Sequence, residues 1–557
     1  MKIQAYAQKQ FWETNPYFDS GTRALVHAMT EEEEILSCFG SELDFGTGGL
    51  RGLMGVGTNR INRYTVRKTS AGLAMYLKER VTSPCVVIAY DSRHHSEELA
   101  EETALTLAAC GVRALLFSNI APTPQLSFAV RYLSCDAGVV ITASHNPKEY
   151  NGYKVYGPDG GQAVPAMADA IRAAIEAISD LTMVMPMTKE EAMATSRFTF
   201  LDESITDAFV DAVLAVQCHL SQDVRDDLRL VYTPLHGAGR VPIQKALTKL
   251  GYAVVTVPEQ EMPNGDFPTV VSPNPEDSAA LTLGIRLAAS MGADLVLGTD
   301  PDSDRVGVAI RTATGYSLLT GNQIGALLTD FLITQGKDGK NAVLVKTIVT
   351  NDLGAEIARA HGIEIRETLT GFKYIGEQMT RMEQDGSGSF FFGYEESYGY
   401  LAGTHARDKD AVVASVLLCE AAALAKAQKK TLWDRLQELY ARYGFYYDAL
   451  DSFEMKGLNG QETMRKLMVF FRNHGADRLG SVKQVLDYQH GIDGLPKSNV
   501  LKFLFEDGSW LAIRPSGTEP KMKIYYSIRS ACEMDARQIL SAWRNNIGQI
   551  MITCGES

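Results

Sequence analysis

The feature that most constrains the fold is a strand–helix–strand–helix–strand pattern that the chain repeats three times. The second copy begins at Leu228 and the third at Asn341, each with strands and helices in the same order. Because apolar strands that alternate with helices pair in parallel through right-handed crossovers, each copy predicts a mostly parallel sheet covered by helices. In the first copy the predicted elements are, in chain order, 85–90, 96–110, 112–117, 125–133 and 137–142.

The length of 557 residues is more than one hydrophobic core usually supports, so we expect about four domains of roughly 140 residues each. After about Tyr440 the repeat stops, and two apolar stretches flank an Asp507-Gly508 turn. The predicted fold class is therefore α/β: three similar α/β domains with mixed, mostly parallel sheets plus a C-terminal α+β domain. The predicted domains are 1–203, which includes an N-terminal helical extension, then 204–318, 319–440 and 441–557.

Charge and hydropathy exclude several classes of partner. The net charge is -13 and no dense Lys/Arg run occurs, so no nucleic acid partner is expected. The most apolar stretch, 411–419, is too short to span a bilayer and the first ten residues lack a signal-type segment, so we expect no membrane partner and a cytoplasmic protein. The eight cysteines include no CxxC pair. Cys85, Cys110 and Cys135 are interpreted as small buried apolar side chains without a function.

Polar strings follow the third strand of each repeat: TASHNP, TDPDSDR and YEESYG. In α/β sheets, binding sites lie beyond the carboxyl ends of the strands, so these strings are the first place to look for chemistry. Asp300, Asp302 and Asp304 alternate along the chain, and their carboxylates can converge on one hard cation, which favours magnesium. The alternative is a solvated acidic turn. An EF-hand is excluded because Arg305 and Arg311 occupy the positions of its glycine and its last acidic ligand.

Ser144 in TASHNP has two interpretations. A serine in a loop usually caps a helix or closes a turn. However, Ser144 follows a strand of buried type, no GxSxG elbow accompanies it, and a carboxylate-bound cation elsewhere suits phosphate rather than acyl chemistry. We therefore interpret Ser144 as a carrier of a phosphoryl group. For His145, hydrogen bonding within the loop and catalysis remain equal alternatives.

Three further strings offer binding groups. RPSGTEPK, from Arg514, combines a guanidinium, hydroxyls and a glycine, as in a phosphate cradle, although a tight turn needs the same residues. FGTGGLRG misses the dinucleotide spacing, and no P-loop string occurs, so nicotinamide and Walker-type ATP binding are disfavoured. Arg51 in that loop is placed to reach a phosphoryl group, and Glu395 and Ser397 suit neighbouring sugar hydroxyls.

The strings TASHNP, GTDPDSDR, YEESYG and RPSGTEPK, in this order, resemble the α-D-phosphohexomutase family, which includes phosphoglucomutases and phosphomannomutases. FGTGGLRG and NGYKVY add to the resemblance, which runs from about Phe45 to the C-terminal helix. It implies four domains around a central cleft, each contributing one loop. It also implies a phosphorylated Ser144 whose phosphate oxygen completes, with the three aspartates, the Mg²⁺ shell.

The resemblance assigns further roles residue by residue. Around the transferring phosphoryl group it implies Arg51, His145, Lys154 and Arg305, with Lys154 or His145 moving a proton. For the sugar and its nonreacting phosphate it implies Gly371, Phe372, Lys373, Glu395 and Ser397, more loosely His405 and Lys409, and then Arg514, Ser516, Gly517 and Thr518.

The implied enzyme is an intramolecular phosphotransferase that interconverts glucose 1-phosphate and glucose 6-phosphate, with glucose 1,6-bisphosphate as activator and intermediate. A phosphopentomutase or phosphomannomutase is the alternative within the family. A non-catalytic sugar-phosphate-binding scaffold is the alternative of another class, and a phosphatase is disfavoured because the separate cradle at Arg514 implies a second phosphate. The expected partner is a small phosphosugar, and the sequence leaves open whether the protein is a monomer or a dimer.

Overall fold

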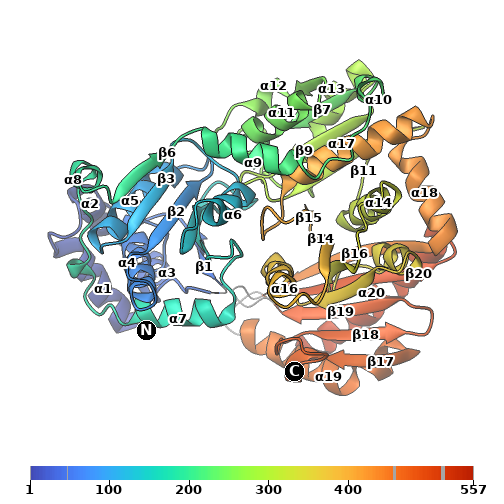
Figure 1. The fold of residues 1–557 in the computed structure, drawn as a ribbon. Coiled ribbons are helices and arrows are strands. Elements are labelled where there is room, and N and C mark those ends of the chain that lie inside the picture. The colour runs from blue at the N-terminus through green and yellow to red at the C-terminus, as the bar shows by residue number, and fades with distance from the viewer. Residues whose placement is uncertain (1, 47, 456–459, 516–520, 556–557) are drawn as a thin grey trace.

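The computed structural model describes residues 2–46, 48–455, 460–515 and 521–555. The described residues form four sheets, each built from one consecutive part of the chain, and helices cover them (Figure 1). The four domains follow one another around the molecule, from blue through green and yellow to red (Figure 1). Three of the sheets are mixed and the fourth is antiparallel, which confirms the predicted fold class. The domain boundaries at 203, 318 and 440 stay predictions.

Domain 1 contains a sheet with the strand order β1-β5-β4-β2-β3-β6. The strands β4, β2, β3 and β6 are parallel, whereas β5 and β1 are antiparallel to their neighbours. Its strands are β1 Gly49–Leu53, β2 Cys85–Tyr90, β3 Arg113–Phe117, β4 Ala137–Ile141, β5 Tyr150–Tyr156 and β6 Phe198–Leu201. Its helices are α4 Arg63–Lys78, α5 Ser96–Ala109, α6 Thr123–Tyr132, α7 Pro165–Glu176 and α8 Lys189–Ala194.

Before this sheet the chain forms three helices, α1 Lys2–Thr14, α2 Ser20–Ala28 and α3 Glu32–Phe39. They enclose a small aromatic core in which Trp12 stacks on Phe18 with 4.3 Å between ring centroids, and Tyr64 of α4 contacts both rings. Aromatic contacts of this kind bury large apolar surfaces, so they fasten the N-terminal helices to domain 1.

Domains 2 and 3 repeat the arrangement with strand orders β11-β10-β9-β7-β8 and β13-β12-β14-β15. The strands are β7 Leu230–Thr233, β8 Val254–Thr256, β9 Leu295–Thr299, β10 Val306–Thr312, β11 Gly315–Leu318, β12 Ala342–Thr347, β13 Glu364–Thr368, β14 Ser389–Glu395 and β15 Gly399–Ala402. The helices are α9 Ser204–Leu214, α10 Gln222–Asp226, α11 Arg240–Lys249, α12 Pro258–Glu261, α13 Thr282–Met291, α14 Gly321–Thr334, α15 Leu353–Ala360, α16 Phe372–Asp385, α17 Ala411–Ala427 and α18 Leu432–Tyr443.

In the second copy of the repeat, the apolar pattern of the sequence predicts a helix at 277–289. The start of this prediction is wrong, because α13 begins at Thr282. The Asp277 side chain accepts a hydrogen bond from the backbone of Ala279 at 2.9 Å, and the Asp277 amide donates to the carbonyl of Asn274 at 3.0 Å. A carboxylate bonded two residues ahead stabilises a turn rather than the first turn of a helix.

Each of the three α/β domains has the same hairpin, which the sequence analysis missed. The third strand of the repeat turns back into an antiparallel strand, as β4 into β5, β9 into β10 and β14 into β15. The three polar strings form these turns. In each turn one non-glycine residue has a left-handed backbone, with φ of 51° at Ser144, 50° at Ser303 and 63° at Tyr398. Such a conformation costs about 1 kcal/mol, so the surrounding contacts must hold it.

Domain 4 is an antiparallel sheet with the order β16-β20-β19-β18-β17 and two long helices. The elements are β16 Phe445–Glu454, α19 Gly460–Leu479, β17 Val482–Asp487, β18 Leu501–Phe505, β19 Trp510–Pro515, β20 Lys521–Ser530 and α20 Glu533–Gly555. Phe471 of α19, Phe503 of β18 and Ile547 of α20 are fully buried in one core. Domain 4 therefore has its own core.

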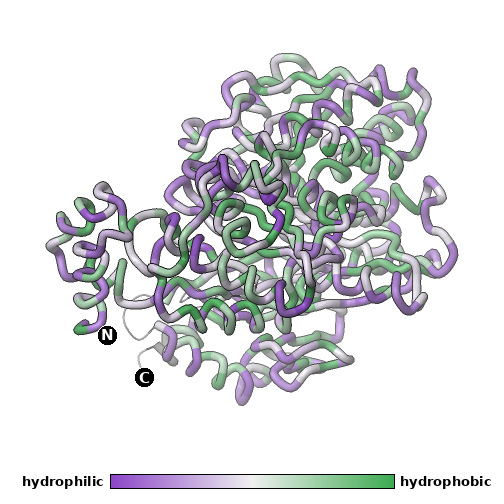
Figure 2. Tube along the Cα trace, turned by 60° about the vertical axis from the view of Figure 1, so that its left-hand side comes forward, coloured by the Kyte–Doolittle hydropathy of each residue, from purple (hydrophilic) through white to green (hydrophobic). Residues whose placement is uncertain are grey.

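Domains 2 and 3 share a continuous hydrophobic core, in which α17 is buried along almost its whole length. Hydrophobic stretches lie mainly inside the domains, whereas hydrophilic stretches follow the outer loops (Figure 2). Within the described residues no single helix is both long and apolar enough to cross a membrane, and one pair, α17 with α18, passes that test together although it is bent by 86°.

Asp448 gives a pH test of the contact between domains 3 and 4. It lies on β16, is half-buried, and accepts a hydrogen bond from Asn351 at 2.8 Å. Burial raises the pKa of Asp448 to about 7, although hydrogen bonds from its neighbours oppose the shift. Because the folded protein retains this proton while the unfolded chain loses it, stability should fall as pH rises from about 4 towards 7.

We expect the free energy of unfolding to fall by about 2–3 kcal/mol between about pH 5 and pH 7 through this residue. Asp448→Asn should lack this part of the dependence, as measured by urea unfolding across the pH range. The exposed Asp477→Asn is the matched control and should follow the unmodified protein. Parallel profiles for Asp448→Asn and the unmodified protein would contradict the prediction.

Candidate active site

Ser144 lies in the turn between β4 and β5 and reaches domain 2. Its Oγ donates a hydrogen bond to Oδ2 of Asp300 at 2.7 Å and lies 3.2 Å from Nδ1 of His145. The backbone amide of Ser144 donates to Oγ1 of Thr142 at 2.8 Å. The hydroxyl is therefore held beside the aspartate loop although 156 residues separate Ser144 from Asp300 in the sequence.

Two residues that the sequence analysis did not single out hold the Ser144 turn. Asp91 follows β2, and its carboxylate accepts hydrogen bonds from Thr142 at 2.7 Å and Ser96 at 2.8 Å. The guanidinium of Arg93 is fully buried, donates to the carbonyls of Ser144 and Asn146, and pairs with Asp91 at 3.3 Å. Their position in the sequence could have identified Asp91 and Arg93, because they also follow the carboxyl end of a parallel strand.

We expect Arg93→Met to destabilise the protein by about 3–5 kcal/mol, because it leaves the buried Asp91 without its cation and the Ser144 turn without its donor. Urea unfolding of the variant measures the loss. Arg80→Met, which removes an exposed arginine paired with Glu79, is the control and should change stability by about 0.5 kcal/mol or less. An equal, small effect of both substitutions would refute the role assigned to Arg93.

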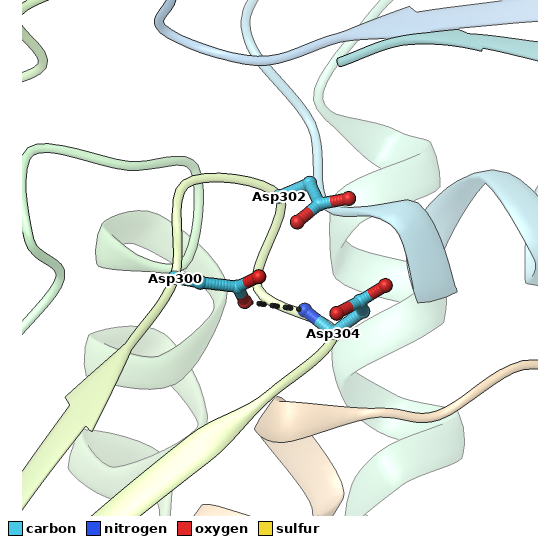
Figure 3. A group of neighbouring side chains, drawn as sticks. All are labelled: Asp300, Asp302 and Asp304. Carbon is cyan, nitrogen blue, oxygen red and sulfur yellow. Dashed lines mark hydrogen bonds between the residues drawn. The ribbon is translucent and has the colours of Figure 1, made fainter. Parts of the chain in front are cut away.

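Asp300, Asp302 and Asp304 lie in the turn between β9 and β10 and are buried (Figure 3). One carboxylate oxygen from each lies within 4.8 Å of the others. The backbone amides of Asp304 and Arg305 donate to Oδ1 of Asp300 at 3.1 and 3.0 Å. The loop thus folds around the Asp300 carboxylate and directs the other two carboxylates towards it.

The aspartate cluster has the properties of a cation site. Burial, and then the charges of Asp302 and Asp304, raise the pKa of Asp300 well above its ordinary value. Although burial favours the neutral acid, the Lys154 ammonium lowers the pKa of Asp302. Oδ1 of Asp302 and Oδ1 of Asp304 are buried and have no hydrogen-bond partner among the residues that the structure describes. Buried carboxylate oxygens without donors are costly, and a hard divalent cation such as Mg²⁺ fits this set of ligands.

Three cationic side chains surround the cluster. Lys154 on β5 donates to Asp302 at 2.8 Å, Lys409 pairs with Asp304 at 2.9 Å, and Arg305 pairs with Glu276. They come from domains 1, 3 and 2, so the cluster gathers positive charge from three parts of the chain. Burial, and then Arg305 and Arg51, hold the pKa of His145 well below its ordinary value, so the imidazole is neutral.

A cavity of about 1330 Å³ opens beside the cluster. It is lined at one side by residues that touch the cluster and at the other by residues of domains 3 and 4. Among the predicted site residues, those lining it are Arg51, His145, Lys154, Arg305, Gly371, Phe372, Lys373, Glu395, Ser397, Lys409 and Arg514. The chain thus gathers these side chains from all four domains into one space.

The side of the cavity formed by domain 4 is rich in positive charge. Arg514 on β19 lies directly across from Lys523 on β20, and both line the cavity with Lys373. Burial, and then Arg514, lower the pKa of Lys373 to about 8. Like charges on adjacent strands repel unless an anion lies between them, so this group suits a phosphate. Lys523 was missed in the sequence, although its position two residues after Lys521 gave a weak signal.

Glu395 ends β14 on the wall of the cavity. Its Oε1 accepts a hydrogen bond from the backbone amide of Gly371 at 2.9 Å. Burial raises the pKa of Glu395 to about 7, although the Lys409 ammonium opposes the shift. The bond to Gly371 joins the YEESYG turn to residues 370–374, which include Gly371, Phe372 and Lys373. The two segments predicted to bind the sugar are therefore held together.

Some predicted site residues lie elsewhere. Nε2 of His405 lies 2.7 Å from Oδ2 of Asp410, the side chain is almost wholly buried, and it contacts Phe209 rather than the cavity. The buried contact with Asp410 holds the side chain, and no local sequence pattern indicates this contact. Ser516, Gly517 and Thr518 lie outside the described residues. The roles assigned to all these residues stay predictions.

Models of known protein families match the chain in four consecutive parts, one for each of the four domains. Four models of the phosphoglucomutase/phosphomannomutase family match it: α/β/α domain I at residues 42–182, α/β/α domain II at 207–315, α/β/α domain III at 320–443 and the C-terminal domain at 472–537. A phosphoglucomutase of Staphylococcus aureus strain MSSA476 is 38% identical over 557 aligned residues, covering 97% of this chain and 98% of the relative.

Solved structures share the fold. A phosphoglucomutase/phosphomannomutase family protein from Burkholderia thailandensis is 18% identical with a TM-score of 0.68, covering 91% of this chain and 97% of that one. The open form of pp63/parafusin from Paramecium, also 18% identical, gives a TM-score of 0.69, with 92% and 96% covered. The chain therefore belongs to the α-D-phosphohexomutase family and is an isomerase of the phosphoglucomutase type.

Proposed function

We propose that this protein interconverts glucose 1-phosphate and glucose 6-phosphate through a phosphoserine at Ser144. The observation that carries the proposal is the 2.7 Å hydrogen bond from Ser144 Oγ to Asp300, beside a cavity whose far wall carries Arg514. A hydroxyl, a cation site and a separate anion pocket are the three parts that moving a phosphoryl group within a phosphosugar needs. The S. aureus relative, named as a phosphoglucomutase, supports the choice of glucose.

In the proposed reaction, the phosphoryl group leaves Oγ of phosphorylated Ser144 and bonds to the free hydroxyl oxygen of the sugar monophosphate. The hydroxyl proton passes to a nearby base, for which Lys154 and His145 are the candidates, and Oγ of Ser144 takes up a proton after its bond to phosphorus breaks. The product is glucose 1,6-bisphosphate. After it turns around, its other phosphoryl group returns to Ser144, so no phosphate is consumed overall.

The side chains in and beside the cavity have different roles in the proposed reaction. Arg305, Lys154 and Lys409 offset the negative charge that collects on the transferring group, while Arg514 holds the phosphate that does not react. Asp300, Asp302 and Asp304 would hold Mg²⁺ with an oxygen of phosphorylated Ser144. The ion would withdraw charge from the phosphoryl oxygens when bound. Glu395 and Ser397 offer hydrogen-bonding groups to the sugar hydroxyls.

Rates with the 1-phosphates of glucose, mannose and ribose test the substrate. We expect glucose 1-phosphate to give the highest kcat/KM, with Mg²⁺ and a trace of glucose 1,6-bisphosphate present. A strong preference for ribose or mannose 1-phosphate would replace glucose with that sugar. Release of inorganic phosphate in place of glucose 6-phosphate would refute a mutase, and absence of any turnover would favour a scaffold.

We also propose that the binding partner of this protein is a small phosphosugar, that the protein acts in the cytoplasm, and that it binds neither nucleic acid nor a membrane.

A further inference from the structure

Two cysteine side chains meet at the end of the domain 1 sheet opposite the candidate active site. Cys85 is the first residue of β2, and Cys135 immediately precedes Asp136 and the neighbouring parallel strand β4. Their Sγ atoms are 3.1 Å apart, closer than the roughly 3.5–4.0 Å optimum between nonbonded carbon atoms. A disulfide bond measures about 2.05 Å, so the sulfur atoms need to approach by only about 1 Å.

Backbone hydrogen bonds hold both residues in place. The amide of Cys85 donates to the Asp136 carboxylate at 2.8 Å, and the amide of Asp136 donates back to the carbonyl of Cys85 at 2.9 Å. The amide of Cys135 donates to the carbonyl of Val130 at 2.8 Å. Because the backbone is fixed on both sides, the sulfur atoms are held in contact rather than meeting by chance. Among the other cysteines within the described ranges, no such sulfur pair occurs.

The environments of the two thiols differ. The hydrogen bond from Cys135, and then the guanidinium of Arg113, lower the pKa of Cys85 to about 7 against the effect of burial. The presence of Cys85, and then burial, raise the pKa of Cys135. Cys85 is half-buried, whereas Cys135 is buried. Cys85 is therefore the more accessible of the two thiols and the one that loses its proton more readily.

We propose that Cys85 and Cys135 form an oxidisable dithiol, which a small-molecule disulfide converts into a disulfide bond within the chain. The main observation behind the proposal is the 3.1 Å contact between the Sγ atoms of Cys85 and Cys135, whose backbones are held by hydrogen bonds. The inference does not depend on the sugar or on the phosphoserine.

The reaction is thiol–disulfide exchange in two steps. The thiolate of Cys85 attacks one sulfur atom of the small disulfide, which forms a mixed disulfide and releases one small thiolate. Cys135 then loses its proton to solvent, and its sulfur attacks Sγ of Cys85 and releases the second small thiolate. The two cysteines lose two electrons, and the small disulfide gains them as it becomes two thiols.

The bond would fasten β2 to β4, the strand that leads into the Ser144 turn. At the other end of β2, Asp91 and Arg93 hold that turn, which itself follows β4. The cross-link joins residues 50 positions apart, so it restricts the unfolded chain and should stabilise domain 1. Neither cysteine lines the cavity of the candidate active site.

The test uses the full-length protein, reduced and then incubated with glutathione disulfide. Blocking of the remaining thiols and peptide mass spectrometry should reveal one cross-linked peptide pair containing Cys85 and Cys135. The thermal midpoint should rise by about 5 °C and return after treatment with dithiothreitol. Cys110→Ser, at a half-buried cysteine that contacts no other cysteine within the described residues, should behave like the unmodified protein.

Single variants test the order of attack. Cys135→Ser should accumulate a glutathione adduct on Cys85, while Cys85→Ser should leave Cys135 unmodified, and neither should show the rise in midpoint. A lasting glutathione adduct on Cys85 in the unmodified protein without a cross-link, or two unreacted thiols, would overturn the proposal. So would a cross-link from either residue to a different cysteine.

Discussion

Replacing Ser144 with alanine is expected to lower the rate of glucose 6-phosphate formation by roughly 10⁴-fold or more, because the substitution removes the oxygen that carries the phosphoryl group. The fold should tolerate the change, since the backbone amide of residue 144 still has Thr142 Oγ1 as acceptor and Arg93 still holds its carbonyl. A coupled assay measures the rate. Intact mass after incubation with glucose 1,6-bisphosphate should show one added phosphoryl group in the unmodified protein and none in the variant.

Ser290→Ala is the matched control, because this exposed serine on α13 donates its hydroxyl to the carbonyl of Leu287 in the same helix. It should keep the rate and accept the phosphoryl group. A Ser144→Ala protein that retained a tenth of the rate, or that still gained the added mass, would show that a different residue carries the group.

Replacing Asp302 with asparagine is expected to lower activity by about 10³-fold, which corresponds to about 4 kcal/mol of lost charge stabilisation. The change removes one negative charge from the cluster and confronts the Lys154 ammonium with an amide. It also removes one of the two buried oxygens that have no donor, and so weakens the cation site. In the unmodified protein, Mg²⁺ should raise the thermal midpoint, because binding to the folded state alone is stabilising.

The thermal measurement separates metal binding from catalysis. The Mg²⁺-dependent rise in midpoint should be lost in Asp302→Asn and kept in Asp226→Asn, which alters an exposed carboxylate on α10. If Mg²⁺ stabilises Asp302→Asn as strongly as the unmodified protein, the three aspartates do not form the cation site.

Local patterns predicted most of the fold. The strands at 85–90 and 137–142 and the helix at 96–110 match β2, β4 and α5 to within one residue, because buried parallel strands and the helices between them have strong periodicity. The hairpin strands β5, β10 and β15 were not predicted, since each follows a turn whose backbone depends on contacts with residues far away in the sequence. At Ser144 that turn is held by Arg93, which lies 51 residues earlier in the chain.

The candidate site residues show the same contrast between features set by neighbouring residues and features set by distant contacts. Asp300, Asp302 and Asp304 are close in sequence, so their convergence followed from a single loop. Arg93, Lys523 and Glu276 gave no motif. The side chain of His405 contacts Asp410 within its own loop, and its predicted role stays a prediction. A short sequence motif shows which chemical groups are available, but it does not show the direction in which each side chain points.

By itself the sequence determined the repeated α/β architecture and the chemical groups in each polar loop, since both depend on residues near one another along the chain. The tertiary structure alone decided that the Ser144 hydroxyl contacts the aspartate cluster, that Arg514 lines a cavity beside this cluster, and that two cysteines touch at the far end of the sheet. The physical reason is that the distances between these groups are fixed by packing within and between domains, whose contacts join residues far apart in the sequence.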